Sequence, residues 1–211
     1  MIITLTATTS SAIAARLVQL REEGGAVALG RVLTLIVSTP EDHVERAVDA
    51  ANDASREHPC RVLVVSPNED ADADDGLDAE IRVGGDAGAS EVIVLRPRGG
   101  ATTELDSLVM PLLLPDAPIV TWWPAAPPES PSQDPLGAMA QRRITDVLEC
   151  SEPMASLTKL AGTHAPGDTD LAWARATLWR GLVAAALDEP PFTQVKGVTI
   201  QGNTDHPSLP L

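Results

Sequence analysis

Aromatic residues are scarce in this chain of 211 residues. It contains four tryptophans, one phenylalanine and no tyrosine, so aromatics make up only 2% of the sequence. The hydrophobic content of 44% must therefore come mainly from Ala, Val, Leu and Ile, which build the core. With so few aromatic rings, the place of each tryptophan is informative about packing or binding.

Cysteine and basic residues are also few. The two cysteines, Cys60 and Cys150, are not spaced as CxxC and are too few for a disulfide framework, so we expect both thiols to be unpaired. Fifteen basic residues face 30 acidic ones, and the net charge of −15 argues against nucleic acid and anionic membrane surfaces as partners. The acidic run at 69–76 lacks EF-hand spacing and is interpreted as a solvated loop.

Long apolar segments are missing too. No run reaches transmembrane length, and the N-terminus does not lead from a charged segment into an apolar one, so we expect a cytoplasmic protein. A chain of 211 residues can bury a full core. We expect one α/β domain over residues 1–211.

Catalytic and cofactor motifs are absent. The two-glycine spacing at 25–30 resembles a phosphate loop, but Arg31 and Val32 stand where Lys and Ser or Thr are needed, and a strand follows. There is no HExxH, no GxSxG and no metal-type Cys/His spacing. The four histidines are scattered, and His43 and His58 fall at opposite ends of one expected helix. The sequence therefore predicts a protein that is not an enzyme and has no metal or cofactor.

The apolar pattern predicts a three-layer α/β fold, a mixed, mainly parallel sheet with helices on both faces. The apolar runs at 31–37, 61–65 and 118–122 are typical of central strands covered on both sides. A helix from 40 to 57 joins the first two as a βαβ unit. The remaining expected elements are an antiparallel strand pair at 79–83 and 91–95, strands at 144–148 and 196–201, a helix capped within 8–11 that runs to about 23, and helices at 103–113, 136–140 and 168–187.

Ligands of open parallel sheets bind beyond the carboxyl ends of the strands. Near those ends the sequence places five charged residues, which define a candidate crevice: Arg142, Arg143, Asp146, Asp168 and Asp170. The two arginines are the close basic pair that a phosphate would need. An ordinary structural role is also open, because Asp168 or Thr169 can cap the following helix and Asp170 suits its first turn.

The last helix carries residues on unexpected faces. Arg175 lies within the apolar face, where it either pairs with an acid such as Asp146 or Asp168 or binds a partner or an anion. Trp173 and Arg180 share the polar face, which suggests an interface or packing against another domain.

Neighbouring tryptophans 122 and 123 point to opposite faces of their strand. One of the two rings can be core. The other must lie under a helix, at a ligand site or at an interface.

Taken together, five segments resemble the glucose-6-phosphate dehydrogenase assembly protein family, OpcA. They are residues 25–35, 118–124 with the Trp-Trp pair, 133–137, 142–146 and 167–180. The resemblance implies a non-catalytic protein that binds glucose-6-phosphate dehydrogenase and promotes its assembly or activation, at the entry of the oxidative pentose phosphate pathway. Family chains are longer, so we expect this chain to be the N-terminal part of a longer one.

The resemblance transfers no catalytic residues. We place the candidate contact surface on the last helix and the nearby strand ends, with Trp122, Trp123, Trp173, Arg175 and Arg180 as candidate residues for partner binding. The alternative function is a sensor or enzyme that binds a sugar phosphate or nucleotide in the strand-end crevice.

Overall fold

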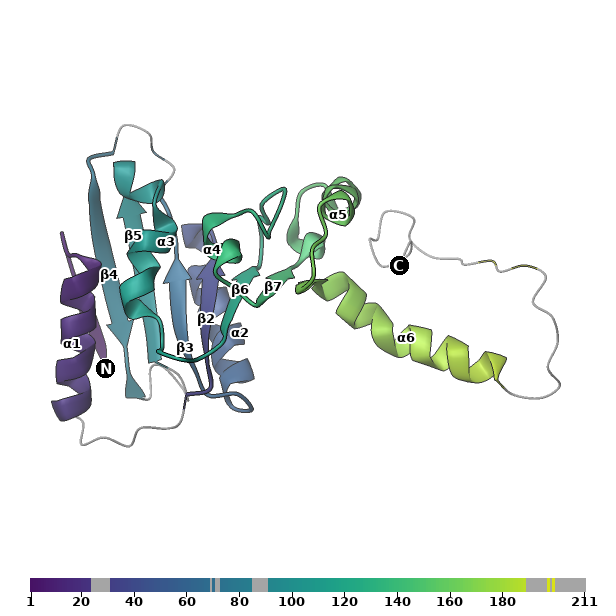
Figure 1. Cartoon of the computed structure of the whole chain (residues 1–211), viewed down its shortest axis with the longest axis horizontal. Coiled ribbons are helices and arrows are strands. Elements are labelled where there is room, and N and C mark those ends of the chain that lie inside the picture. The colour runs from purple at the N-terminus through teal and green to yellow at the C-terminus, as the bar shows by residue number, and fades with distance from the viewer. Residues whose placement is uncertain are drawn as a thin grey trace.

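A mixed sheet of eight strands, in the order β1-β4-β5-β3-β2-β6-β7-β8, organises the computed structural model (Figure 1). The structure describes residues 1–23, 31–68, 70, 73–84, 91–188, 197 and 199. The strands are β1 (Ile2–Leu5), β2 (Leu33–Ser38), β3 (Cys60–Val65), β4 (Gly76–Arg82), β5 (Glu91–Arg98), β6 (Ile119–Trp123), β7 (Arg142–Thr145) and β8 (Asp168–Asp170).

Most of the sheet is parallel. Strands β5, β3, β2, β6, β7 and β8 run in one direction. At one side β4 pairs antiparallel with β5, and β1 pairs antiparallel with β4 and so runs with the main group. In the register of the centre, Leu35 lies opposite both Val62 and Val120. Every residue of β3 is buried, because helices cover both faces of the sheet there. The predicted mixed, mainly parallel sheet is confirmed, and its three predicted central strands are interior.

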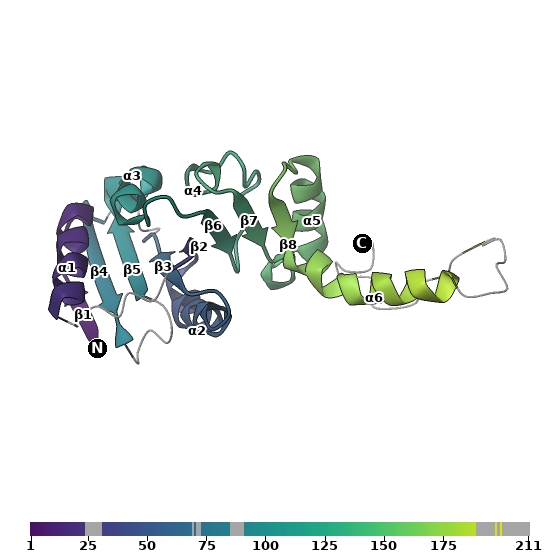
Figure 2. The same cartoon turned by 60° about the horizontal axis from the view of Figure 1, so that its bottom comes forward.

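Helices cover the two faces unequally (Figure 2). On one face α1, α3 and α4 pack a core that includes Ile13, Leu63 and Leu112. On the other face α2 packs Val48 against Val62 and neighbouring valines. The helices are α1 (Ser10–Glu23), α2 (Val44–Ser55), α3 (Leu105–Val109), α4 (Pro135–Ala138), α5 (Pro153–Gly162) and α6 (Leu171–Leu187), and the short 3-10 turns are η1 (Glu41–His43), η3 (Gly99–Thr102), η4 (Met110–Leu112) and η5 (Val147–Glu149).

A buried carboxylate stabilises the edge of the core opposite the crevice. Glu91 is 2% exposed and accepts hydrogen bonds from Arg61 at 2.7 Å and Arg21 at 3.0 Å. Arg61 also donates to the carbonyl of Leu112 at 2.6 Å. This ion pair therefore joins β3 and β5 to the end of the α3 segment, and each buried charge has a partner.

Several predicted elements were wrong in extent or kind. The helix expected from 103 to 113 is α3 flanked by the 3-10 turns η3 and η4, with Pro111 inside η4. The strand expected at 144–148 begins earlier, at Arg142, and ends at Thr145, where η5 takes over. The last helix does not begin at 168, because Asp168–Asp170 forms β8 and Asp170 is the N-cap of α6.

Three elements were not predicted: β1, α5 and β8, which lies where the last helix was expected to begin. The antiparallel pair β4 and β5 was predicted at a sheet edge, but β1 lies outside β4. The glycine-rich segments at 24–30 and 85–90, part of the acidic run, and the strand expected at 196–201 (apart from 197 and 199) lie outside the described residues.

Candidate functional site

The N-terminal turn of α6 is fixed to the sheet by Asp170. Its carboxylate accepts a hydrogen bond from the amide of Ala172 at 2.8 Å, as an N-cap does. The same carboxylate accepts from the Thr145 hydroxyl at 2.7 Å and from the Val147 amide at 3.1 Å. A single side chain therefore joins the start of α6 to the end of β7, which sets where the helix leaves the domain.

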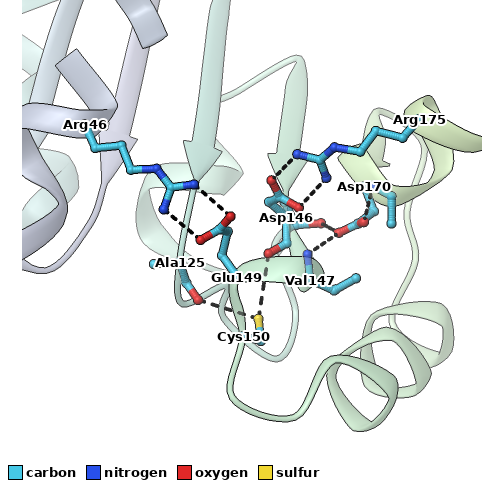
Figure 3. A network of polar contacts seen from close by, with 10 residues as sticks. Arg46, Ala125, Asp146, Val147, Glu149, Cys150, Asp170 and Arg175 are labelled. Carbon is cyan, nitrogen blue, oxygen red and sulfur yellow. Dashed lines mark hydrogen bonds and ion pairs between the residues drawn. The ribbon is translucent and has the colours of Figure 1, made fainter. Parts of the chain in front are cut away.

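Asp146 and Arg175 form a second connection at the base of α6 (Figure 3). The two guanidinium nitrogens of Arg175 donate to the two carboxylate oxygens of Asp146, at 2.7 and 2.8 Å. Asp146 is only 4% exposed, so its charge needs this partner. The Asp146 carboxylate raises the pKa of Arg175 through this hydrogen bond.

A further ion pair, between Arg46 and Glu149, joins α2 to the turn η5, which directly follows Asp146. Arg46 donates to both carboxylate oxygens of Glu149 at 2.8 Å (Figure 3). This contact holds the pKa of Glu149 below its usual value of 4.5. The turn η5 thus carries one bidentate link to α2 and is preceded by another to α6, so it couples the two helices.

Between these two ion pairs lies a pocket of about 230 Å³. It is floored by Trp122 and bordered by Pro124 and Ala47. It lies beyond β2 and β6, neighbouring strands whose connections run in opposite directions along the sheet, which is the usual place for a ligand site in such folds. The buried indole nitrogen of Trp122 has no hydrogen-bond partner among the described residues.

The outer part of α6 is an apolar surface in solvent. The helix leaves the sheet edge and projects away from the domain (Figure 1). Only Ala172 and Ala176 of α6 are buried. Among the described residues, six large side chains of α6 are exposed by 44 to 73%: Trp173, Leu178, Trp179, Leu182, Val183 and Leu187. We call these six residues the α6 surface.

Arg180 extends this surface by stacking on Trp173. Its guanidinium carbon lies 3.4 Å from the centroid of the indole ring, a cation–π contact. The same guanidinium donates to the Trp173 carbonyl at 3.1 Å and to the Thr177 hydroxyl at 2.9 Å. The Trp173–Arg180 pair is therefore held in one arrangement in the isolated helix.

The paired tryptophans of β6 point to opposite faces, as their alternation requires. Trp123 is 2% exposed and lies on the face covered by α4, so it is a core residue. Trp122 is half-buried beside α2 and floors the small pocket. Trp122 alone of the two can contact a bound molecule without a rearrangement of the core.

Of the five residues of the candidate crevice, Asp146 lines the small pocket, and Arg143 and Asp168 pair with each other. Arg143 is buried and donates to Asp168 and to the carbonyls of Ala140 and Pro166. It therefore fixes the turn before β8 and has few donors left for a phosphate, while its neighbour Arg142 is exposed. That turn contains Gly167, whose φ of +99° is strained for any residue with a side chain.

Sequence reasoning missed two parts of this site. The Arg46–Glu149 pair joins residues 103 positions apart, and no local pattern signals it. The exposure of Leu178 and Trp179 was not foreseen either, because apolar spacing on a helix normally indicates burial. One signal of this exposure was available in the sequence. The apolar face extends along the whole helix, from Leu171 to Leu187, and the helix also carries two tryptophans.

The fold and this site define an α/β protein with a solvent-facing apolar helix, and the described part of the chain holds no cluster of His, Cys, Asp and Glu suited to a metal ion. Two family models match the chain, and both describe a glucose-6-phosphate dehydrogenase subunit. The model of its N-terminal domain matches residues 51–162, and the model of its C-terminal domain matches residues 166–211. The chain belongs to this family, which we identified by resemblance as OpcA.

One curated relative supports the assignment. The chain is 26% identical over 167 residues to the "Putative OxPP cycle protein OpcA" of Synechocystis sp.. That match covers 74% of this chain and 35% of the relative, so the chain spans about a third of the relative's length. No solved structure matches the chain.

The boundary between the two family models falls within the fold described above. It lies between α5, which ends at Gly162, and β8, which begins at Asp168. The second matched segment therefore contributes both β8 and the whole of α6. Across the described residues, none of the helices combines the length and the apolar character needed to cross a bilayer.

Proposed function

We propose that this protein is a non-catalytic partner of glucose-6-phosphate dehydrogenase, which it binds through the α6 surface to promote assembly or allosteric activation of the enzyme. The α6 surface is the observation that carries the proposal. Leu178 and Trp179 are 73% and 71% exposed, on the outer part of a helix whose buried residues, Ala172 and Ala176, lie near its start. Large exposed apolar surface marks interaction sites in soluble proteins.

The residue types of the α6 surface suit a protein partner. Interfaces draw most of their binding energy from a few Trp, Tyr and Arg residues. Half of the four tryptophans of the chain lie on α6, and Arg180 is already ordered against one of them. An ordered pair loses less side-chain entropy on binding, which favours affinity.

The base of α6 supports the same role. Asp146 and Asp170 hold the first turn of the helix to the sheet through the hydrogen bonds of Figure 3. A helix anchored at one end presents its outer residues in a defined direction, which a binding surface needs. The dehydrogenase as the partner is supported by the family to which the chain belongs.

The test measures binding of the purified chain to its cognate dehydrogenase, together with the kinetics of that enzyme. We expect Trp179→Ala to weaken binding by about 2 kcal/mol, roughly 30-fold, and to reduce activation in proportion. The matched control is Val18→Ala, since Val18 is 51% exposed on α1, far from α6 in the fold. If the two variants and the wild type bind the dehydrogenase equally well, the α6 surface is not the binding surface.

The absence of turnover is tested separately. The purified chain, freed of contaminating dehydrogenase, is expected to produce no NADPH from glucose 6-phosphate and NADP. This expectation rests on the lack of a catalytic constellation in the sequence and of a poised acid–base pair at the site described above. Turnover that co-purifies with the chain through successive columns would contradict it.

A further inference from the structure

A second, larger pocket lies at the same edge of the sheet, on the far side of η1. It has a volume of about 640 Å³, within the range of small-molecule sites. It opens beyond the carboxyl ends of β2, β3 and β5, where ligands bind in open α/β sheets. Its polar lining comes from Glu41, Ser66, Asn68, Asp78, Arg96 and Arg98.

Two polar groups in this pocket are buried without hydrogen bonds among the described residues. The first is the hydroxyl of Ser66, a residue that is 3% exposed. The second is the Nε of Arg98. A buried donor without a partner is costly, and a bound molecule or an ordered water can satisfy such groups.

Arg98 and Arg96 differ in how far their charges are paired. Arg96 donates to Glu41 at 2.8 Å and lies 3.7 Å from Glu80. Arg98 makes a single ion pair among the described residues, to Asp78 at 3.5 Å, which is long for a hydrogen bond. Arg98 therefore keeps most of its donor capacity for a ligand, and Arg96 does not.

We propose that this pocket binds a small polyhydroxylated organic anion. The oxyanion lies against Arg98 and the Ser66 hydroxyl, and the hydroxyl groups of the ligand donate to Glu41 and Asp78. Guanidinium is the side-chain group best suited to a carboxylate or phosphate. The site is distinct from the α6 surface, and the proposal does not depend on the dehydrogenase.

The carboxylates of Glu41 and Asp78 determine which class of anion suits the pocket. Glu41 and Asp78 repel an anion that offers only oxygens, whereas the hydroxyls of a sugar or hydroxy acid donate to them. A nucleotide fits less well, because the described residues that line the pocket include no aromatic ring for its base. Sugar phosphates and hydroxy acids share the required chemistry, and the experiment separates them.

The experiment is isothermal titration of the isolated chain with glucose 6-phosphate, gluconate and uncharged glucose. We expect at least one of the two anions to bind and glucose to bind at least about tenfold more weakly, since it lacks the charge that Arg98 recognises. The preferred anion identifies the source. If neither anion binds with a Kd below about 10 mM, the proposal is overturned.

Variants then locate the binding. Arg98→Ala is expected to weaken binding of the preferred anion at least about tenfold and Ser66→Ala about threefold, because a charged hydrogen bond contributes more than a neutral one. Arg56→Ala is the matched control, since it removes an equal charge at an exposed position outside the pocket. Unchanged binding by Arg98→Ala would overturn the assignment.

Folding of the variants is checked by circular dichroism. If Arg98→Ala does not fold, Arg98→Lys replaces it, since lysine keeps the charge and the stem but loses the forked donors. We expect this variant to bind about fivefold or more weakly, and full affinity would again overturn the proposal. Because the readout uses the chain alone, failure here leaves the dehydrogenase proposal standing, and the reverse is also true.

Discussion

Arg175 reaches from the apolar face of α6 to the buried carboxylate of Asp146 and makes two hydrogen bonds to it, at 2.7 and 2.8 Å. This pairing explains why an arginine occurs inside a stripe of leucines. One residue of the stripe joins the helix to the sheet, and those beyond it, such as Leu178 and Leu182, remain exposed. The pair therefore divides α6 into an anchored turn and a free surface.

Loss of the Asp146 carboxylate should loosen α6. We expect Asp146→Asn to lower the free energy of unfolding by about 1–3 kcal/mol, because it removes the buried charge that pairs with Arg175. Dehydrogenase binding should weaken as well, since the helix loses its direction. Chemical denaturation and a binding titration measure the two effects. Glu57→Gln, an exposed acid at the end of α2, is the control for the change of charge and should alter neither.

Trp173 is expected to contribute to binding more than to stability. The side chain is 44% exposed and its contact with Arg180 lies within the helix, so Trp173→Ala removes little core packing. We expect dehydrogenase binding to weaken by about 2 kcal/mol with a nearly unchanged thermal midpoint. A fully buried ring would instead cost about 3–5 kcal/mol of stability. A large fall in the midpoint with undiminished binding would assign Trp173 to packing.

The Arg46–Glu149 link predicts a dependence on pH. Because hydrogen bonding to Arg46 lowers the pKa of Glu149 in the folded state, the link stabilises the protein fully above the usual pKa of 4.5. That contribution is lost as the pH falls through the lowered value. Urea unfolding of wild type and Glu149→Gln, compared at neutral and acid pH, measures it. We expect the two proteins to differ near pH 7 and to converge once the pH falls below the lowered pKa of Glu149.

The buried ion pair of Glu91 should matter most for stability. Glu91→Gln leaves the guanidinium of Arg61 buried without its counter-charge, which costs about 3–5 kcal/mol. Chemical denaturation measures the loss, and Glu22→Gln, an exposed position on α1, is the control. A double change to apolar residues, Arg61→Met with Glu91→Leu, should recover part of the loss. A stable single variant would show that solvent reaches this site.

The two cysteines, which no disulfide joins, should differ in how fast their thiols are alkylated. Burial raises the pKa of the Cys150 thiol above its usual value, so less thiolate is present at neutral pH. We expect iodoacetamide to modify Cys150 more slowly than a free thiol. Cys60 is 3% exposed and should react only when the protein unfolds. Mass mapping after timed alkylation at several urea concentrations checks both expectations, and rapid labelling of Cys60 without urea would contradict them.

The sequence alone determined the elements whose pattern is local and strong. The apolar run at 62–65 in β3 predicts a strand covered on both faces, since no other arrangement buries all four of these side chains. The helix α1 (Ser10–Glu23) was predicted with a cap within residues 8–11 and an end at about residue 23, because its apolar spacing and the glycines after it are nearby signals. The sequence also predicted Asp146 and Asp168 as the two candidate acidic partners of Arg175.

Tertiary structure alone decided between such alternatives. Asp168 pairs with Arg143 and Asp146 with Arg175, because β8 aligns beside β7, and strand pairing at that distance in the chain has no local signature. The short strands β1 and β8 exist through their neighbours, which supply hydrogen bonds that four or three residues could not secure alone. The exposure of α6 has the same origin. The spacing of apolar residues predicts the apolar face of α6. Whether that face is buried depends on the direction in which the anchored first turn holds the helix.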